Sequence, residues 1–369
     1  MKIAIFGLTI SSSWGNGHAT LWRGLCRSLS EDGHHIVFFE RNVPYYAGAR
    51  DLYEMPGGGE LILYEEWGEI AARAKREIGD SDVAIVSSYC PDAIAAGDLV
   101  VERAALSVFY DLDTPVTLSR RARGEGNFYI GADGLANFDL VLSYTGGRAL
   151  DALREELGAR RVAPLYGHVD PELHKPAEAR GVYCAHLSYL GTYAEDRQAA
   201  LETLFLEPAR RRPQSRFLIG GALYPQEFPW GANVYFVRHL PPGEHPAFFA
   251  SSRATLNITR ADMARMGWCP SGRLFEAAAC GAPLLSDRWD GLDAFFTPGE
   301  ELLVVDTPEE VLNALDSSDG ELTRMAARAR DSVLAEHSSK NRARDLLACL
   351  EEAMSETKPS SHHQWAAEA

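Results

Sequence analysis

Short apolar runs rich in β-branched and aromatic residues alternate with amphipathic helical segments through the first half of the chain. Each run is bounded by turn residues and is apolar on both faces, which is typical of parallel strands covered by helices on both sides. The pattern therefore predicts a doubly wound α/β sheet. Its strands are expected at residues 2–8, 35–40, 82–88, 105–111, 140–145 and 161–167.

The same alternation begins again after a stretch at residues 168–180. Pro171 and Pro176 favour extended chain there, so this stretch is the best domain boundary. A second sheet is expected, with strands at 182–191, 216–221, 234–240, 254–259, 282–287 and 301–306. We predict two Rossmann-like domains, 1–168 and 169–337, that face a cleft, then a helix over 338–354 that packs back on the first domain and a disordered tail over 355–369.

Charge and cysteine content restrict the classes of partner and the location that are expected for such a protein. The chain has 36 Lys and Arg against 52 Asp and Glu, a net charge of −16, so no large basic surface for nucleic acid is expected. Its 6 cysteines show no C-x-x-C spacing and are interpreted as reduced thiols, which indicates a cytoplasmic location. Apolar stretches are too short for a membrane span. A small molecule is the expected partner.

Ligands of open α/β sheets bind at the carboxyl ends of the strands, so the loops that follow strands are where chemistry is expected. The most informative loop precedes a helix that Ser271 can cap. Gly272 would let a phosphate approach the free N–H groups of that helix, and Arg273 would add a guanidinium beside it. Glu276 lies one turn further, where a carboxylate can accept both hydroxyls of a ribose. The alternative is a capped core helix with an ordinary surface Glu and Arg.

A second phosphate-binding candidate follows the first strand of the second domain. Gly191 permits close approach of a ligand, Thr192 can cap or donate to phosphate, and Arg197 can neutralise a diphosphate leaving group. The alternative is a surface ion pair between Arg197 and Glu195 or Asp196. Arg260, after the strand at 254–259, is a further cationic candidate, while Asn257 can instead fix the loop.

In the first domain, the loop at residues 14–18 lacks the third glycine of a dinucleotide fingerprint, and Glu40, which could hold a ribose, is generic. Nicotinamide cofactors are therefore not expected. His18 begins the following helix, where it can accept a proton from a hydroxyl group or steady a phosphate. The alternative is a histidine that only packs the loop.

Asp111 and Asp113 end another strand, and alternation along a strand aims both toward the same side. They can act as a base or bind acceptor hydroxyls, and Asp-x-Asp also leaves open a Mn²⁺ or Mg²⁺ site. Asp113 can alternatively organise the turn before Thr114-Pro115. The histidines His34, His35, His174 and His186 lack the spacing of a zinc site.

The second half of the chain resembles the C-terminal domain of the GT-B glycosyltransferases, and its nearest likeness is to the spore-maturation CgeB-like branch. Residues 257–260, 270–281, 286–292 and 297–301 carry this resemblance, and residues 167–171 resemble the turn that joins the two GT-B domains. Glu276 matches the second glutamate of the family's E-x7-E motif, which binds the ribose. The first glutamate falls at Trp268, so the stereochemical outcome is left open.

The resemblance implies metal-independent, hexosyltransferase-type transfer from an NDP-sugar, UDP- or dTDP-linked, to a small-molecule or glycan acceptor, with no cofactor besides this co-substrate. The first domain would hold the acceptor and the second the donor. We predict that His18 and Asp113 act as acid and base, and that the donor is held by Gly191, Thr192, Arg197, Arg260, Ser271, Gly272, Arg273 and Glu276.

Two alternatives share this architecture. One is a non-hydrolysing NDP-sugar 2-epimerase, and the other is a nucleotide-sugar-binding protein without catalysis, which Trp268 favours. The sequence leaves open the base, the sugar, the acceptor and the oligomeric state.

Overall fold

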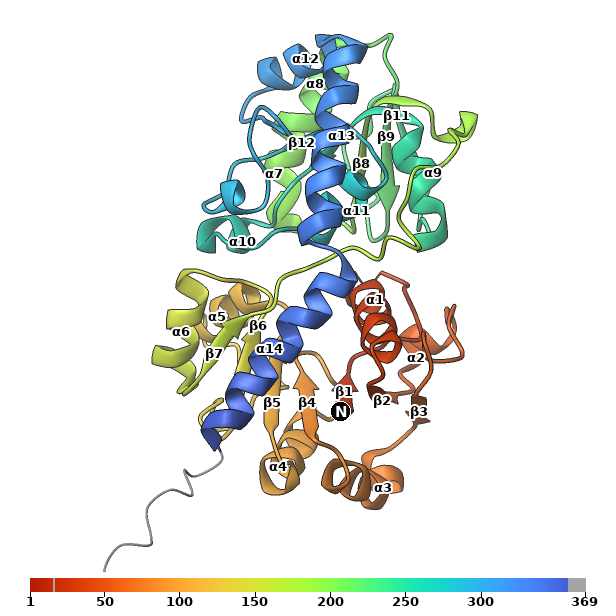
Figure 1. The fold of residues 1–369 in the computed structure, drawn as a ribbon. Helices are drawn as coiled ribbons and strands as arrows, with labels where there is room; N and C mark the ends of the chain where they lie inside the picture. The colour runs from red at the N-terminus through yellow and green to blue at the C-terminus, as the bar shows by residue number, and fades with distance from the viewer. Residues whose placement is uncertain (16, 358–369) are drawn as a thin grey trace, which may run out of the picture.

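Two parallel sheets form the two lobes of the protein in a computed structural model, which describes residues 1–15 and 17–357 (Figure 1). The first sheet has seven strands in the order β3-β2-β1-β4-β5-β6-β7, and the second has six in the order β10-β9-β8-β11-β12-β13. The predicted α/β fold class is confirmed. The strands are β1 (Lys2–Gly7), β2 (His35–Arg41), β3 (Glu60–Tyr64), β4 (Val83–Ser87), β5 (Ser107–Asp111), β6 (Leu140–Ser143), β7 (Val162–Pro164), β8 (Ala185–Leu190), β9 (Phe217–Gly221), β10 (Val234–Arg238), β11 (Ser252–Asn257), β12 (Leu284–Ser286) and β13 (Leu303–Val304).

Each predicted strand overlaps an observed one, but the sequence analysis missed β3. This strand lies at the edge of its sheet, where Ile62 and Tyr64 are buried and Leu63 is exposed. A half-exposed edge strand lacks the continuous apolar character that revealed the central strands.

Helices cover both faces of each sheet, and apolar clusters fill the space on either side. They are α1 (Gly17–Glu31), α2 (Pro44–Ala47), α3 (Trp67–Gly79), α4 (Ala93–Arg103), α5 (Thr114–Ala122), α6 (Arg148–Leu157), α7 (Gln198–Leu201), α8 (Glu207–Arg211), α9 (His245–Ala250), α10 (Ala261–Met266), α11 (Gly272–Ala279), α12 (Pro308–Asp316), α13 (Asp319–Glu336) and α14 (Ser339–Thr357).

Helix α14 returns from the second lobe to the first, as Figure 1 shows. Its buried Leu346 and Leu350 belong to the same apolar cluster as Trp22 and Leu25 of α1. The helix continues through Thr357, so the tail predicted to be disordered from residue 355 is helical over its first residues, and 358–369 lie outside the described residues. Arg161 donates to the carbonyl oxygen of Ala353 at 3.3 Å and pairs with Glu356, which supports this last turn.

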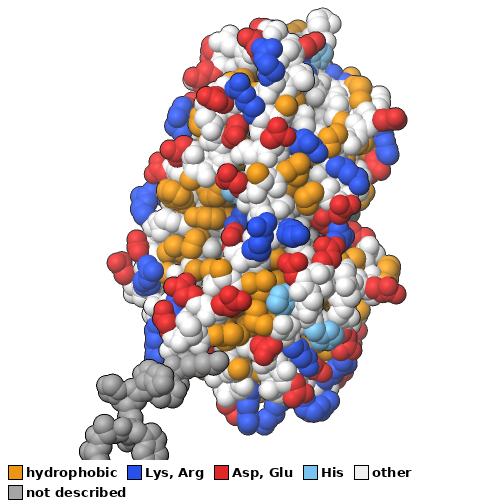
Figure 2. All heavy atoms as spheres, viewed as in Figure 1, with side chains coloured by type: hydrophobic (Ala, Val, Ile, Leu, Met, Phe, Trp, Pro, Cys, Tyr) orange, Lys and Arg blue, Asp and Glu red, His pale blue; other side chains and the backbone are white. Residues whose placement is uncertain are grey.

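The strand order reverses between β1 and β4 in the first sheet and between β8 and β11 in the second. Such reversals open a crevice at the carboxyl ends of the strands, where α/β proteins bind ligands. On the face drawn in Figure 2, acidic and basic side chains are interspersed rather than separated into large patches. Within the described ranges, no helix has both the length and the apolar character that crossing a membrane requires.

Candidate functional site

A cavity of about 270 Å³ lies between the carboxyl ends of the two sheets. The structure brings every residue predicted for the site to the wall of this one cavity, although they follow different strands of both lobes. These are His18, Asp113, Gly191, Thr192, Arg197, Arg260, Ser271, Gly272, Arg273 and Glu276.

Buried carboxylates hold the loop between β1 and α1. Glu40, at the end of β2, accepts hydrogen bonds from Thr9 Oγ1 at 2.9 Å, Ile10 N at 2.7 Å and Ser11 N at 2.9 Å. Asp51 accepts from Ser13 N at 3.1 Å. Glu40 therefore fixes the loop that leads to His18 and is not a ribose ligand; the sequence pattern gave no sign of this role.

His18 and Asp113 meet across the cavity wall of the first lobe. The distance between His18 Nε2 and Asp113 Oδ2 is 3.7 Å, and both side chains keep partial access to solvent, at 21% and 18%. The Tyr89 ring lies 5.7 Å from the His18 ring. Burial, and then the charge of Asp113, raise the pKa of Tyr89, so its hydroxyl stays protonated and donates to Asp113. The Asp113 carboxylate and the His18 imidazole thus lie side by side, and both are partly exposed.

Asp111 does not join them, contrary to the prediction that both aspartates face one side. Its side chain is fully buried, and Oδ1 accepts hydrogen bonds from Asp113 N and from Thr117 Oγ1, each at 3.1 Å. The strand ends at Asp111, so the alternation of side chains does not extend to Asp113. It is Asp111, rather than Asp113, whose side chain organises the turn, and burial raises its pKa to about 6.

On the second lobe, α11 points its N-terminus at the cavity. Ser271 caps this helix as predicted, because its Oγ accepts from Arg273 N at 3.3 Å. Contacts from the first lobe fix the preceding segment: Tyr144 donates to the carbonyl oxygen of Pro270 at 2.8 Å, and Thr145 to Cys269 Sγ at 3.1 Å. The free N–H groups of the first turn are thereby presented to a ligand.

Trp268 occupies a contact between the lobes. Its carbonyl oxygen accepts from Gly146 N at 2.9 Å, and its own N–H donates to Asp290 O at 2.7 Å. The indole packs between Gly147 and Gly291, where an added Cβ would lie 2.5 Å and 2.6 Å from ring atoms. Both glycines have positive φ, at 54° and 86°, which other residues rarely adopt. The ring of Trp268 is therefore packed tightly between these two glycines.

The two other cationic candidates differ in their pairing. Arg197 Nη1 donates to the carbonyl oxygen of Thr192 at 3.1 Å, and its buried Nε has no hydrogen-bond partner among the described residues. Asp196 pairs with Arg260 at 3.3 Å and not with Arg197, so the surface pair considered for Arg197 is wrong. Asn257 fixes its loop, because Nδ2 donates to Ser286 Oγ at 3.2 Å.

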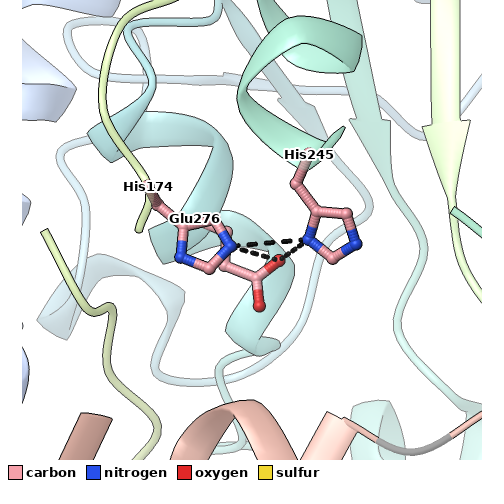
Figure 3. Close-up of side chains that lie close together, drawn as sticks. All are labelled: His174, His245 and Glu276. Atoms are coloured by element: carbon pink, nitrogen blue, oxygen red, sulfur yellow. Dashed lines mark hydrogen bonds and ion pairs between the residues drawn. The ribbon is translucent and has the colours of Figure 1, made fainter. Parts of the chain in front are cut away.

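Glu276 is buried rather than an ordinary surface residue. Arg273 forms an ion pair with it, His245 Nδ1 lies 3.2 Å from its Oε2, and His174 Nε2 lies 3.7 Å from the same oxygen (Figure 3). Burial opposes ionisation, but the charge of Arg273 holds the pKa of Glu276 well below its usual range. No spacing in the sequence linked these histidines to Glu276.

The donor atoms of His174, His245 and Glu276 lie within 4.8 Å of one another, close enough to share a cation. Arg273 Nη1, however, contacts Glu276 and lies 3.2 Å from His245 Nδ1. The guanidinium already supplies the positive charge, so we assign no metal to this cluster.

Comparison with known proteins agrees with this architecture. Residues 197–348 match the model of a family described as glycosyl transferase-like. No curated protein matches the sequence significantly. Among solved structures, sucrose-phosphate synthase from Thermosynechococcus elongatus has a TM-score of 0.68 at 15% identity, over 96% of this chain and 100% of that chain.

Two further structures carry ligands. HepE of Anabaena, in complex with UDP and glucose, has a TM-score of 0.67 at 13% identity, over 95% of this chain and 100% of that chain. T4 phage β-glucosyltransferase, in complex with UDP and Mn²⁺, has a TM-score of 0.62 at 14% identity, over 96% and 99% of the two chains. The fold of this protein is therefore the GT-B fold of glycosyltransferases.

The buried Asp111 generates a prediction about stability and pH. Its pKa of about 6 in the folded protein exceeds the value of 3.8 for an exposed aspartate, so the folded state binds this proton more tightly. The wild type should therefore lose stability as pH rises through this window, whereas Asp111→Asn cannot titrate. From about pH 5 to about pH 7, we expect the free energy of unfolding of Asp111→Asn to rise by about 1–2 kcal/mol relative to that of the wild type.

Urea unfolding at both pH values measures this difference. Asp133→Asn, at an exposed aspartate, controls for the loss of one negative charge. A difference between Asp111→Asn and wild type that does not change with pH would contradict the assignment.

Proposed function

We propose that the protein is a glycosyltransferase that moves a sugar from an NDP-sugar, UDP- or dTDP-linked, to a hydroxyl group of an acceptor. The observation that carries the proposal is the 270 Å³ cavity between the lobes. The N-terminus of α11 and arginines line one side of it, and a paired His18 and Asp113 line the other. These are the groups that a leaving diphosphate and an attacking hydroxyl require.

The donor is proposed to bind the second lobe. The N-terminus of α11 and the guanidinium groups of Arg197 and Arg273 would neutralise the diphosphate, and Glu276 would accept the ribose hydroxyls. HepE and the T4 phage enzyme, which share the fold, are described in complexes with UDP. This supports a uridine nucleotide as the first choice among donors.

The acceptor is proposed to bind the first lobe. His18 Nε2 would take the proton of the attacking hydroxyl, and Asp113 would stabilise the imidazolium that forms, since the two groups lie 3.7 Å apart. The net charge of −16 favours a small-molecule or glycan acceptor over nucleic acid. We further propose a hexosyl donor, a place in the CgeB-like branch and a cytoplasmic location.

A nucleotide-sugar-binding protein without transfer is the second candidate, and Trp268 favours it. The indole fills the position where the resemblance would place a carboxylate near the sugar. Turnover separates the candidates, because transfer needs an acceptor and releases NDP, an epimerase converts the NDP-sugar without an acceptor, and a binding protein releases no NDP. Thermal-shift screening of UDP- and dTDP-sugars, followed by NDP release with a panel of acceptors, tests the proposal.

Glu276→Gln should weaken binding of the preferred NDP-sugar by about 1–3 kcal/mol, because an amide keeps only one acceptor and no charge for the ribose hydroxyls. Isothermal titration calorimetry measures this loss. Glu178→Gln, at an exposed glutamate, is the matched control. Unchanged affinity in a folded Glu276→Gln variant would remove Glu276 from the ribose site.

His18→Ala should slow the transfer step by roughly 10²–10⁴ while NDP-sugar affinity stays close to wild type, because the donor binds the other lobe. The control is His35→Ala, at an exposed histidine of the same lobe. Single-turnover rates, with melting curves for both variants, distinguish a catalytic role of His18 from a packing role. Transfer at the wild-type rate would exclude His18 as the base.

Transfer should survive an excess of EDTA, because arginines and a helix terminus would balance the diphosphate charge. The T4 phage enzyme is described with UDP and Mn²⁺, so the comparison is informative. The measurement is the rate before and after chelation. Activity that is lost on chelation and restored by Mn²⁺ or Mg²⁺ would contradict metal independence.

A further inference from the structure

A buried pair of histidines contacts the Glu276 carboxylate. His245 begins α9, and His174 lies in the segment that joins the lobes. Their side chains are 2% and 0% exposed, and their rings lie 5.6 Å apart. Figure 3 shows both rings directed at the Glu276 carboxylate. Neither lies among the residues that line the 270 Å³ cavity, although His245 borders a smaller adjoining pocket that Arg273 also lines.

The hydrogen bonds fix which nitrogen of His245 carries a proton. Nε2 lies 3.2 Å from the carbonyl oxygen of Leu240, which can only accept, so Nε2 is the donor. In the neutral ring, Nδ1 is then an acceptor. It faces Glu276 Oε2 at 3.2 Å, which is also an acceptor, and Arg273 Nη1 at 3.2 Å, which donates. Arg273 thus holds together two groups that would otherwise repel each other, and His174 Nε2 lies beside both, 3.4 Å from His245 Nδ1 and 3.7 Å from Glu276 Oε2.

The proposed function gives Arg273 a second partner. The side chain of Arg273 is 31% exposed and lines the cavity, whereas that of Glu276 is 8% exposed. A bound diphosphate would compete with Glu276 for the same guanidinium. If Arg273 turns to the diphosphate, the lone pairs of His245 Nδ1 and Glu276 Oε2 are left facing each other. A proton on Nδ1 converts that contact into a charge-assisted hydrogen bond.

We propose that His245 is a positioning residue for donor binding: when the diphosphate draws Arg273 from Glu276, His245 takes up one proton from solvent and holds the carboxylate for the ribose hydroxyls. The proposal rests on the proposed function. It adds a residue that supports Glu276 and a proton that is taken up when the donor binds.

The charges around the cluster favour this exchange. Burial and then Arg273 lower the pKa of His245, while Glu276 raises it. Burial lowers the pKa of His174 to about 4, with Arg273 also lowering it and Glu276 and Asp170 raising it. Cys280, the remaining titratable neighbour of Glu276, has a pKa raised above its usual range by burial and stays neutral. Removing the charge of Arg273 from the cluster therefore raises the pKa of both histidines.

Calorimetry with UDP-glucose tests the proposal, with dTDP-glucose as the second probe. Neither diphosphate has a free terminal phosphate that would titrate near neutral pH. Titrations in buffers of different ionisation enthalpy give the number of protons taken up on binding. We expect uptake by the wild type, and an affinity that falls as pH rises, by at most about 10-fold per pH unit for one linked proton.

His245→Asn is the critical variant, because its amide nitrogen can take the place of Nδ1 and donate permanently to Glu276. It should bind the sugar nucleotide without proton uptake and with an affinity that no longer depends on pH in this way. His186→Asn, at an exposed histidine on the opposite end of β8, should behave as wild type. Binding by the wild type without uptake, or equal uptake by His245→Asn, would overturn the proposal.

Arg273→Gln keeps the test decisive if His245→Asn does not fold. Without the guanidinium, the proton should already be present in the free protein, so binding should be weaker and take up none. If Arg273→Gln took up as many protons on binding as the wild type, the proposed move of Arg273 from Glu276 to the diphosphate would be overturned. A folded wild type that binds no NDP-sugar would instead overturn the proposed function.

Discussion

The two places where the chain crosses between the lobes are hydrogen-bonded to each other, and the cavity depends on that contact. Val169 N donates to His337 O at 3.0 Å, and Ser339 N donates to Val169 O at 2.7 Å. Arg342 of α14 adds a hydrogen bond to the carbonyl oxygen of Gly167 at 3.1 Å. Because α14 then buries leucines in the core of the first lobe, the crossing is anchored on both sides. The carboxyl ends of both sheets are held facing each other.

The Trp268 ring makes a second contact between the lobes, and this contact depends on close packing. Its ring fits between two glycines that belong to different lobes, and its backbone is hydrogen-bonded to Gly146 of the first lobe and Asp290 of the second. The same segment leads directly into α11, so the contact between the lobes also orients the helix N-terminus. A large aromatic residue at this position gains packing between the lobes.

Carboxylates around the cavity divide into those that hold loops and those that remain available. Glu40 and Asp111 are buried, Asp287 is half-buried, and all three accept hydrogen bonds from backbone N–H groups of loops. Burial raises the pKa of Asp287 to about 6, as it does for Asp111. Asp113 and Glu276 line the cavity instead. Residue type alone does not separate these roles, because burial and partners decide them.

Local patterns in the sequence determined the strands other than the edge strand β3, the helix cap at Ser271 and the edge at which site residues gather. These follow from apolar periodicity and from the rule that parallel strands end at one edge. Contacts between residues distant in sequence were decided only by the tertiary structure. It turned Asp111 inward, paired Asp196 with Arg260, and placed His174 and His245 behind Glu276. Each depends on which elements pack together, and no spacing along the chain encodes that.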